Sequence, residues 1–190
     1  MLPIDLQARM LLATGDVDDI LIGNAFASED EFKKLQEVLQ ENEKLSKELD
    51  PTLKMLVDHG IISLDKPVKK LRVTLDEEIT EKEKEVLFDF FPHLEMGDSS
   101  EWIWRTRISR FKYSQPNEIL TPRHYDKEMF EVGDVVIVND NYKHYAGEIQ
   151  IVKIPIVNDG TRNRIGHLDS DEYQMMELVY DGDLVEFLEK

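Results

Sequence analysis

The stretch "DVVIVNDNYKHYAGEIQIV", Asp134 to Val152, has the pattern of two β-strands joined by a polar loop. Apolar residues run from Val135 to Val138, and they return at Ile149 and Ile151 after Gly147. The loop between them spans roughly five to nine residues, which is longer than a tight two-residue hairpin. This stretch therefore predicts a strand pair at the centre of a β-rich unit.

Short strand patterns continue outward from this hairpin in both directions. "LRVTL" lies before it, and the other strand patterns are "WIWRTRIS", "DVVIVN", "GEIQIVKIPIV", "NRIGHL", "QMMELVY" and "LVEFL". Turn-forming clusters such as "VNDGTRN" separate them. One helix is expected from Thr80, which has capping-box spacing to Glu83, as far as Pro92. Six or seven short strands with one helix predict a small closed or nearly closed β-barrel over residues 69–190.

Residues 1–65 have a different pattern, which predicts a helix, a strand and a further helix. Ile20–Ile22 is a short apolar run of the kind found in buried strands, and the polar Asn24 follows it. Ser28 has capping-box spacing to Glu31, and a charged helix with apolar positions is expected over Glu29–Glu48. A buried strand between helices is typical of a parallel α/β fold. The whole chain is therefore predicted to be α+β, with two regions of unlike architecture.

Composition limits the classes of partner and compartment. The 190 residues include 40 acidic and 23 basic ones, which gives a net charge of −17. Such a field repels phosphate backbones and anionic lipid, which argues against nucleic-acid and membrane-surface binding. No apolar run approaches the ~20 residues that a membrane helix needs. The absence of cysteine suits a reducing compartment, so we expect a cytoplasmic protein.

Three arginines are the first candidate binding residues. In "WIWRTRISR", Trp102 to Arg110, strand alternation places Arg105 and Arg107 on one face, with Arg110 near the end. Guanidinium groups so placed could hold a carboxylate or phosphate in bidentate fashion. The alternative is that they form surface ion pairs with some of the many acids, which contributes little to stability. The sequence leaves both interpretations open.

The loop of the hairpin supplies the second set of candidates. Asn139, Asp140 and Asn141 favour turns because their side chains bond to nearby backbone groups. Tyr142 and Tyr145 are less needed by a turn, and tyrosines at the mouth of a barrel suit contacts with sugars or with other subunits. The loop could therefore be purely structural or part of a binding site.

Several enzyme classes have no supporting motif in this sequence. Zinc-site spacing such as H-E-x-x-H, the phosphate-binding P-loop, G-x-G-x-x-G and G-x-S-x-G are all missing. No metal or cofactor is therefore expected. With 40 acidic residues, carboxylate-pair chemistry stays open, but no pair is distinctive in the sequence.

Three passages together resemble the MupG-type 6-phospho-N-acetylmuramidase family. They are "VDDILIGNAFASEDE" (Val17 to Glu31), "RTRISR" (Arg105 to Arg110) and "GDVVIVNDNYKHYAGEIQI" (Gly133 to Ile151). The third passage is the most specific because its pattern is long and unusual. Members of this family have an N-terminal TIM barrel followed by a cyclophilin-like β-barrel. They are cytoplasmic and cleave a phosphorylated muramyl disaccharide taken up during cell-wall recycling.

The resemblance implies a fold and a substrate for each region. Residues 1–65 would be the C-terminal piece of a (β/α)₈ barrel, and residues 69–190 a cyclophilin-like β-barrel domain. Family members commonly have an acid where Asn24 stands, at the carboxyl end of the last barrel strand. A phosphorylated amino sugar would be the substrate, with these candidate binding residues: Arg105, Arg107, Arg110, Asn139, Asn141, Tyr142 and Asn24. The resemblance assigns no catalytic acid within this chain.

We therefore expect the chain to be the C-terminal part of a 6-phospho-N-acetylmuramidase that hydrolyses nothing by itself. The reason is that most of the barrel, which would hold the acids, is not in these 190 residues. An alternative is a non-catalytic cyclophilin-like module that binds a sugar phosphate or a protein partner. A third interpretation is a purely structural lid or dimer surface. A homo-oligomer is a further expectation for the assembly.

Overall fold

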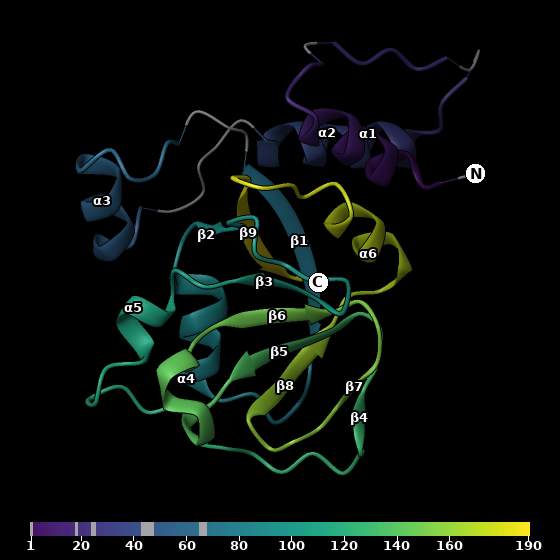
Figure 1. Ribbon diagram of the computed structural model, residues 1–190. Helices are drawn as coiled ribbons and strands as arrows, with labels where there is room; N and C mark the ends of the chain where they lie inside the picture. Colours follow the sequence, from purple (N-terminus) through teal and green to yellow (C-terminus); the bar gives the residue numbers. More distant parts are fainter. Residues whose placement is uncertain (1, 18, 24–25, 43–47, 65–67) are drawn as a thin grey trace.

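The computed structural model describes residues 2–17, 19–23, 26–42, 48–64 and 68–190 of the chain. It is a mixed α+β fold in which helices precede a seven-stranded sheet. Three helices occupy the first region: α1 (Ile4–Ala13), α2 (Glu29–Asn42) and α3 (Pro51–Asp58). Figure 1 shows α1 and α2 side by side at one end of the sheet, next to the later helix α6.

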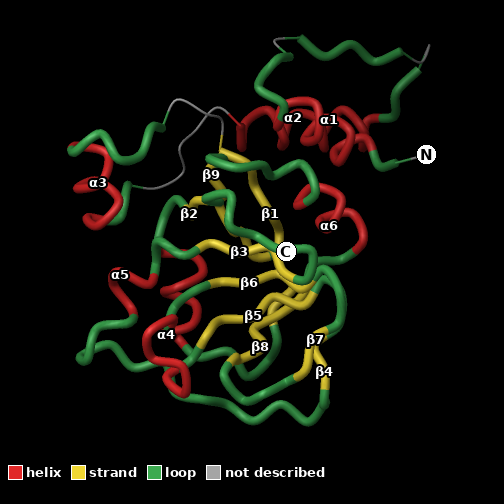
Figure 2. The backbone as a smooth tube through the Cα atoms, in the orientation of Figure 1, coloured by secondary structure: helices red, strands yellow, loops and turns green. Residues whose placement is uncertain are grey.

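The seven strands of the main sheet lie in the order β2-β9-β1-β8-β5-β6-β3. Only β1 and β9 pair in parallel, and the remaining neighbours are antiparallel. In chain order the strands are β1 (Val68–Leu75), β2 (His93–Leu94), β3 (Ile103–Thr106), β5 (Asp134–Val138), β6 (Ile149–Val152), β8 (Arg162–His167) and β9 (Leu184–Glu189). The long strands curve around a shared interior, as the tube in Figure 2 shows.

The two edge strands of this sheet meet and nearly close it into a barrel. The His93 side chain on β2 forms a 3.2 Å hydrogen bond with the Thr106 hydroxyl on β3. Aromatic rings fill the interior beside it: His93 lies 5.0 Å from Phe187, which in turn lies 6.2 Å from Trp104, between ring centroids. The expected nearly closed barrel over this region is confirmed as a barrel-like sheet.

Short elements connect and cover these strands. They are α4 (Glu81–Lys84), the π-helical turn η1 (Glu85–Asp89), α5 (Arg110–Tyr113), β4 (Met129–Phe130), the 3₁₀ segment η2 (Asp140–Tyr145), β7 (Ile156–Val157) and α6 (Ser170–Met176). The expected capping box begins α4, because the Thr80 hydroxyl accepts from Glu83 N–H while the Glu83 carboxylate accepts from Thr80 N–H. A two-stranded sheet of β4 and β7 lies beside the main sheet.

The hairpin quoted above forms β5 and β6, with η2 as its loop. Val135 pairs with Ile151 and Ile137 with Ile149. Gly147 has a φ of +87°, and a Cβ atom there would lie 2.5 Å from the Cβ of Tyr113. Glycine is needed at this position for both reasons, because other residues rarely adopt that backbone and no space exists for a side chain.

One predicted strand is wrong. "QMMELVY" is predicted to be extended, but its first three residues complete α6, which ends at Met176, and its last four form a turn and irregular backbone. The Asp169 side chain caps this helix by accepting hydrogen bonds from the N–H groups of Asp171 and Glu172. Met175 and Met176 are buried against the sheet. The cap and the packing surface decide the conformation, whereas the apolar run alone fits either structure.

The predicted strand at Ile20–Ile22 is not formed either. These residues have no regular secondary structure, and the Leu21 side chain is 92% exposed. A parallel strand requires neighbours that accept and donate its backbone hydrogen bonds, and none lies beside it among the described residues. Helix α2 forms over Glu29–Asn42 of the expected Glu29–Glu48, and residues 43–47 lie outside the described part of the chain. The (β/α)₈ piece is therefore not reproduced as a strand between helices.

Helix α1 is nevertheless fixed firmly to the β-rich region. The buried Arg9 side chain pairs with the Glu172 carboxylate on α6, with Nη1 2.5 Å from Oε1. Arg9 also donates to the Lys70 carbonyl oxygen at 2.8 Å, and Glu172 accepts the Arg72 N–H at 2.9 Å. The contact joins α1, β1 and α6, so the two regions share one packed core at this point.

Candidate functional site

The three arginines converge around two carboxylates at the end of β3. Arg105 lies on β3 itself and donates from Nη2 to the Asp98 carboxylate at 2.8 Å and from Nε to the Asp98 carbonyl at 3.0 Å. Its Nη1 lies 3.6 Å from Glu148 Oε1. Arg107 Nη1 lies 3.1 Å from the same Asp98 carboxylate. The arginines are therefore partly paired with acids, as the surface alternative expected, yet they stay together.

Glu148 is the centre of this group, and the sequence did not single it out. It lies immediately before β6, and its side chain has no exposed surface. Arg110 Nη1 donates to its Oε2 at 3.1 Å, and the Gln150 amide donates to its Oε1 at 2.7 Å. A carboxylate this deeply buried requires such charged and polar partners. The only signal was its place in "AGEIQI", beside the obligatory Gly147.

Arg107 and Arg110 also line an open pocket of about 390 Å³. Its remaining lining residues are Met96, Phe111, Ser114, Gln115 and His144. This lining, which the structure describes completely, contains two guanidinium groups and no carboxylate. The Arg107 side chain is 40% exposed, so part of its hydrogen-bonding capacity faces solvent. The pocket can therefore hold an anion, because its free donors are positive and no acid inside it opposes a ligand.

Two tyrosines extend the arginine group toward the hairpin loop. The Arg110 guanidinium lies 4.3 Å from the centroid of the Tyr145 ring, and Tyr145 lies 4.5 Å from Tyr142. Tyr142 is about half exposed. Removal of its hydroxyl from water and the nearby Tyr145 hydroxyl raise the pKa of Tyr142 above its ordinary value of 10.0. Tyr142 thus remains a neutral hydrogen-bonding group beside the arginines.

The asparagines are held elsewhere by backbone groups. The buried Asn139 donates to the Gly160 carbonyl at 3.1 Å and to the Asn163 side chain at 2.8 Å, while its oxygen accepts the Asn141 N–H. Asn141 donates to the same Gly160 carbonyl at 2.9 Å. Both amides fix the loop, as their turn preference indicated. The remaining candidate, Asn24, lies outside the described residues.

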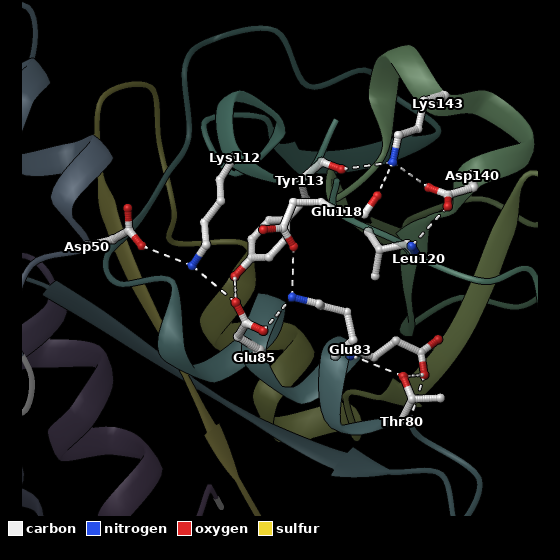
Figure 3. Close-up of polar contacts among 11 residues, drawn as sticks. Asp50, Thr80, Glu83, Glu85, Lys112, Tyr113, Glu118, Leu120, Asp140 and Lys143 are labelled. Atoms are coloured by element: carbon white, nitrogen blue, oxygen red, sulfur yellow. Dashed lines mark hydrogen bonds and ion pairs between the residues drawn. The ribbon is translucent and has the colours of Figure 1, made fainter. Parts of the chain in front are cut away.

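A network of lysines and carboxylates holds the wall that carries Arg110 and Phe111. Figure 3 shows Lys112 between Asp50 and Glu85, with Tyr113 donating to the Glu85 carboxylate. Lys82 donates to the same carboxylate at 2.7 Å. Burial and the neighbouring Glu85 carboxylate raise the pKa of Tyr113 far above its ordinary value, so it donates at any physiological pH. Lys112 and Tyr113 belong to α5, so this network anchors that helix beside the pocket.

The same network fixes the hairpin loop on the opposite side of α5. Lys143 donates to the carbonyl oxygens of Tyr113 and Glu118, and it pairs with the Asp140 carboxylate at 2.9 Å. Asp140 in turn accepts the Leu120 N–H at 3.2 Å. The loop, α5 and the segment after it are therefore cross-linked by charge-assisted hydrogen bonds. The same set of contacts therefore fixes the loop that carries Tyr142 and the helix that carries Arg110.

No described helix combines the length and the apolar character needed to pass through a membrane. Within the same described part of the chain, no group of three or more His, Asp or Glu side chains is arranged to hold a metal ion.

Comparison with known proteins gives matches to both regions. Residues 69–188 match the family described as "6-phospho-N-acetylmuramidase, C-terminal", and residues 1–37 match "6-phospho-N-acetylmuramidase, N-terminal". No curated protein matches the chain.

Two solved structures are similar over 98% of this chain. An uncharacterized B. cereus protein is 29% identical with a TM-score of 0.73, and the match covers 45% of that protein. A conserved Enterococcus faecalis protein of unknown function is 18% identical with a TM-score of 0.56, covered to 41%, and this likeness concerns the fold alone. The chain thus spans less than half the length of both proteins.

Proposed function

This chain belongs to the 6-phospho-N-acetylmuramidase family, and we propose that residues 69–190 form the anion-binding wall of such a glycosidase. The substrate would be a phosphorylated muramyl disaccharide of cell-wall recycling in the cytoplasm. The observation that carries this proposal is the pocket lined by Arg107 and Arg110 without any carboxylate among its described lining residues. Those two arginines would bind the phosphate or the lactyl carboxylate of the amino sugar.

The pairing of each arginine decides its proposed role. Arg105 is engaged by Asp98 and Glu148, so it holds the group together and leaves little for a ligand. Arg110 is oriented by Glu148 and by the Tyr145 ring, and its other nitrogen atoms are available toward the pocket. A charge-assisted hydrogen bond contributes about 1.5–3 kcal/mol. Arg110, supported by Arg107, is therefore the main proposed phosphate contact.

The size and apolar surface of the pocket suit one sugar ring. Its volume of about 390 Å³ lies at the lower end of the range for small-molecule pockets, roughly 300–1,000 Å³. Phe111, which is 62% exposed, offers an apolar surface at its edge. Tyr142 would bond a sugar hydroxyl group, and Asn139 and Asn141 hold the loop in shape. These contacts would orient the sugar while the arginines bind its anionic group.

We also propose that this chain alone binds substrate without hydrolysing it. Glycoside hydrolysis requires two carboxyl groups, roughly 5–9.5 Å apart, on either side of the scissile bond. The acids nearest the pocket do not offer such a pair, because Glu148 is fully buried against Arg105 and Arg110 and Asp98 pairs with Arg105 and Arg107. In the complete enzyme the acid and its partner would come from the barrel domain.

Ligand titration tests the proposal directly. Calorimetry with muramic acid 6-phosphate and with its unphosphorylated form would be run on the wild-type chain, Arg110→Gln and Arg107→Gln. We expect Arg110→Gln to weaken binding of the phosphorylated sugar about ten-fold or more, with a smaller effect on the other sugar. Lys127→Gln, which removes an exposed charge outside the pocket lining, is the matched control.

Each result of this titration separates the proposal from its rivals. Equal losses for both sugars would assign the arginines to the lactyl carboxylate instead of the phosphate. No binding of either sugar by the wild-type chain would overturn the pocket as a substrate site. Hydrolysis is tested separately by incubating the wild-type chain with a phosphorylated muramyl disaccharide. Sugar release that stops when one of its carboxylates is replaced would overturn the non-hydrolytic assignment. Binding to many unrelated sugar phosphates would favour the non-catalytic module.

A further inference from the structure

A buried glutamine on β6, Gln150, links the arginine pocket to strand β8. Glu148 and Gln150 are two residues apart in an extended stretch, so their side chains leave the same face of the sheet. Gln150 also pairs directly with Arg105 on β3, and such opposed side chains lie close together on one face. Although polar, Gln150 is only 4% exposed. Its amide must therefore find its hydrogen-bond partners inside the protein.

The two hydrogen bonds of the Gln150 amide fix which way it points. Its Nε2 donates to Glu148 Oε1 at 2.7 Å, and its Oε1 accepts from Arg162 Nε at 2.7 Å. A guanidinium group only donates and a carboxylate only accepts, so a reversed amide would lose both bonds. Arg162 is itself held by the Asp159 carboxylate, whose oxygen atoms lie 3.2 Å and 3.3 Å from Nη1. Contacts outside the pocket therefore direct the amide hydrogen atoms at Glu148.

The Gln150 amide determines how Glu148 is shared with the arginines. Glu148 Oε2 accepts from Arg110 Nη1 at 3.1 Å, whereas Arg105 Nη1 lies 3.6 Å from Oε1, beyond an ordinary hydrogen bond. Gln150 thus supplies the close hydrogen bond to Oε1 that a fully buried carboxylate requires. Without the amide, Arg110 would bond both oxygen atoms, because guanidinium and carboxylate groups readily form two parallel hydrogen bonds. The second bond would take nitrogen atoms away from the pocket.

We propose that Gln150 is a positioning residue for the arginine pocket, which keeps Arg110 bonded to Glu148 through one nitrogen atom only. The rest of the guanidinium group then remains available for the anionic group of the substrate. This proposal deepens the function proposed above and rests on it, because Arg110 is the main proposed phosphate contact. Gln150 is not among the residues that line the pocket. It therefore acts on a ligand only through Glu148 and Arg110.

A double-mutant cycle between positions 150 and 110 tests this role. Calorimetry with muramic acid 6-phosphate would compare the wild-type chain, Gln150→Met, Arg110→Gln and the double variant. Methionine is close to glutamine in length and volume but has no amide. Gln150→Met should weaken binding about ten-fold in the wild-type background, and less than about two-fold in the Arg110→Gln background. Ile165→Val, at a buried position on β8 outside these contacts, controls for destabilisation alone and should leave the affinity unchanged.

Arg162→Gln is a second variant that does not disturb a fully buried site. The Arg162 side chain is 20% exposed, and its loss removes the donor that orients the Gln150 amide. Binding should weaken about three-fold, again only where Arg110 is present. Lys127→Gln is the control for loss of one positive charge. No loss of affinity from either variant, or equal losses in both Arg110 backgrounds, would overturn the positioning role.

Chemical labelling without any ligand separates this role from the proposed function. Phenylglyoxal modifies accessible guanidinium groups, and mass spectrometry gives the rate at each arginine. Labelling of Arg110 should be about five-fold slower in Gln150→Met, because both edges of its pairing with Glu148 would be engaged, while Arg107 should react as in the wild type. If the wild-type chain binds no sugar but this difference is present, the proposed function fails and the positioning of Arg110 by Gln150 stands. An unchanged Arg110 rate would overturn the positioning role, whatever the result with the sugar.

Discussion

Similar apolar side chains are buried in the β-rich region but exposed in the first 64 residues. Phe187 on β9 is 1% exposed and Ile137 on β5 is fully buried, whereas Phe32 and Leu21 in the first region are 56% and 92% exposed. Both regions have apolar positions at regular spacing. The difference shows that periodicity predicts an element with an apolar face, but burial also requires a second surface to pack against.

Helices α1 and α3 of the first region do pack against the β-rich region, and this packing orders them. Leu6 of α1 and Leu53 of α3 are each 1% exposed and belong to the main hydrophobic core. Asp50 begins α3 and also lies near Lys112, so that helix is tied to α5. Docking onto the barrel, and not an independent core, therefore accounts for the order of α1 and α3.

The largest expected difference in unfolding free energy is between alanine substitutions of two phenylalanines, one in each region. Phe187→Ala should lower the free energy of unfolding by about 3–5 kcal/mol, because it leaves a cavity in the closed interior. Phe32→Ala removes the same atoms from an exposed helix face and should cost less than about 0.5 kcal/mol. Urea unfolding of both variants checks this pair. Similar losses would contradict the contrast between the two regions.

The contact that joins the regions should give the second largest effect. Arg9→Met leaves the buried Glu172 carboxylate without its charged partner, which costs about 3 kcal/mol or more. Limited proteolysis should then cut within residues 2–64 first and leave 69–190 intact. Lys34→Met, which breaks an exposed ion pair with Asp30 on α2, is the control and should not change the cleavage pattern. Earlier digestion of residues 69–190 would show that the division into regions is wrong.

The smallest expected effect on stability comes from Glu85, in the network beside α5, and it depends on pH. Burial opposes the ionised form of Glu85, but hydrogen bonds from Lys82 and Lys112 outweigh it and hold its pKa below the ordinary 4.5. Its contribution is therefore fully present above pH 4.5 and is lost as the pH falls through the lower folded-state pKa.

Glu85→Gln should accordingly cost about 1 kcal/mol at neutral pH, a value reduced by the partial exposure of the pair. The difference from wild type should shrink in acid, which urea unfolding at pH 7 and below 4.5 measures. Glu101→Gln, at an exposed position, is the control for loss of one charge. A difference that grows in acid would exclude this role for Glu85.

Much of the β-rich region followed from local sequence. The strands around "LRVTL" and "DVVIVN", the helix start at Thr80 and the loop role of Asn139 are determined by neighbouring residues, and the structure has each of them. The strand expected in "QMMELVY" failed because the Asp169 cap and a packing surface for Met175 and Met176 favour a helix. A short apolar run without such context does not distinguish the two conformations.

The candidate site could be predicted from the sequence only in part. Strand alternation correctly placed Arg105 on the opposite face from the buried Trp104. It could not show that Glu148 would lie fully buried between Arg105 and Arg110, because β3, α5 and β6 meet there only after folding. Nothing in its residue type distinguishes Glu148 from the other acids among the 40 in the sequence. The pocket at Arg107 and Arg110 likewise exists only through the packing of α5.

The sequence by itself determined the family, the apolar and polar faces of most elements, and the residues that begin helices and turns. These are properties of residues close together in the chain, so short patterns carry them. The tertiary structure decided which arginines line the open pocket, which carboxylate is buried and which apolar side chains remain exposed. Those outcomes depend on contacts between residues such as Arg9 and Glu172, or Arg110 and Glu148, that are distant in sequence. Burial changes the energy of a charge or an apolar group only once such contacts form.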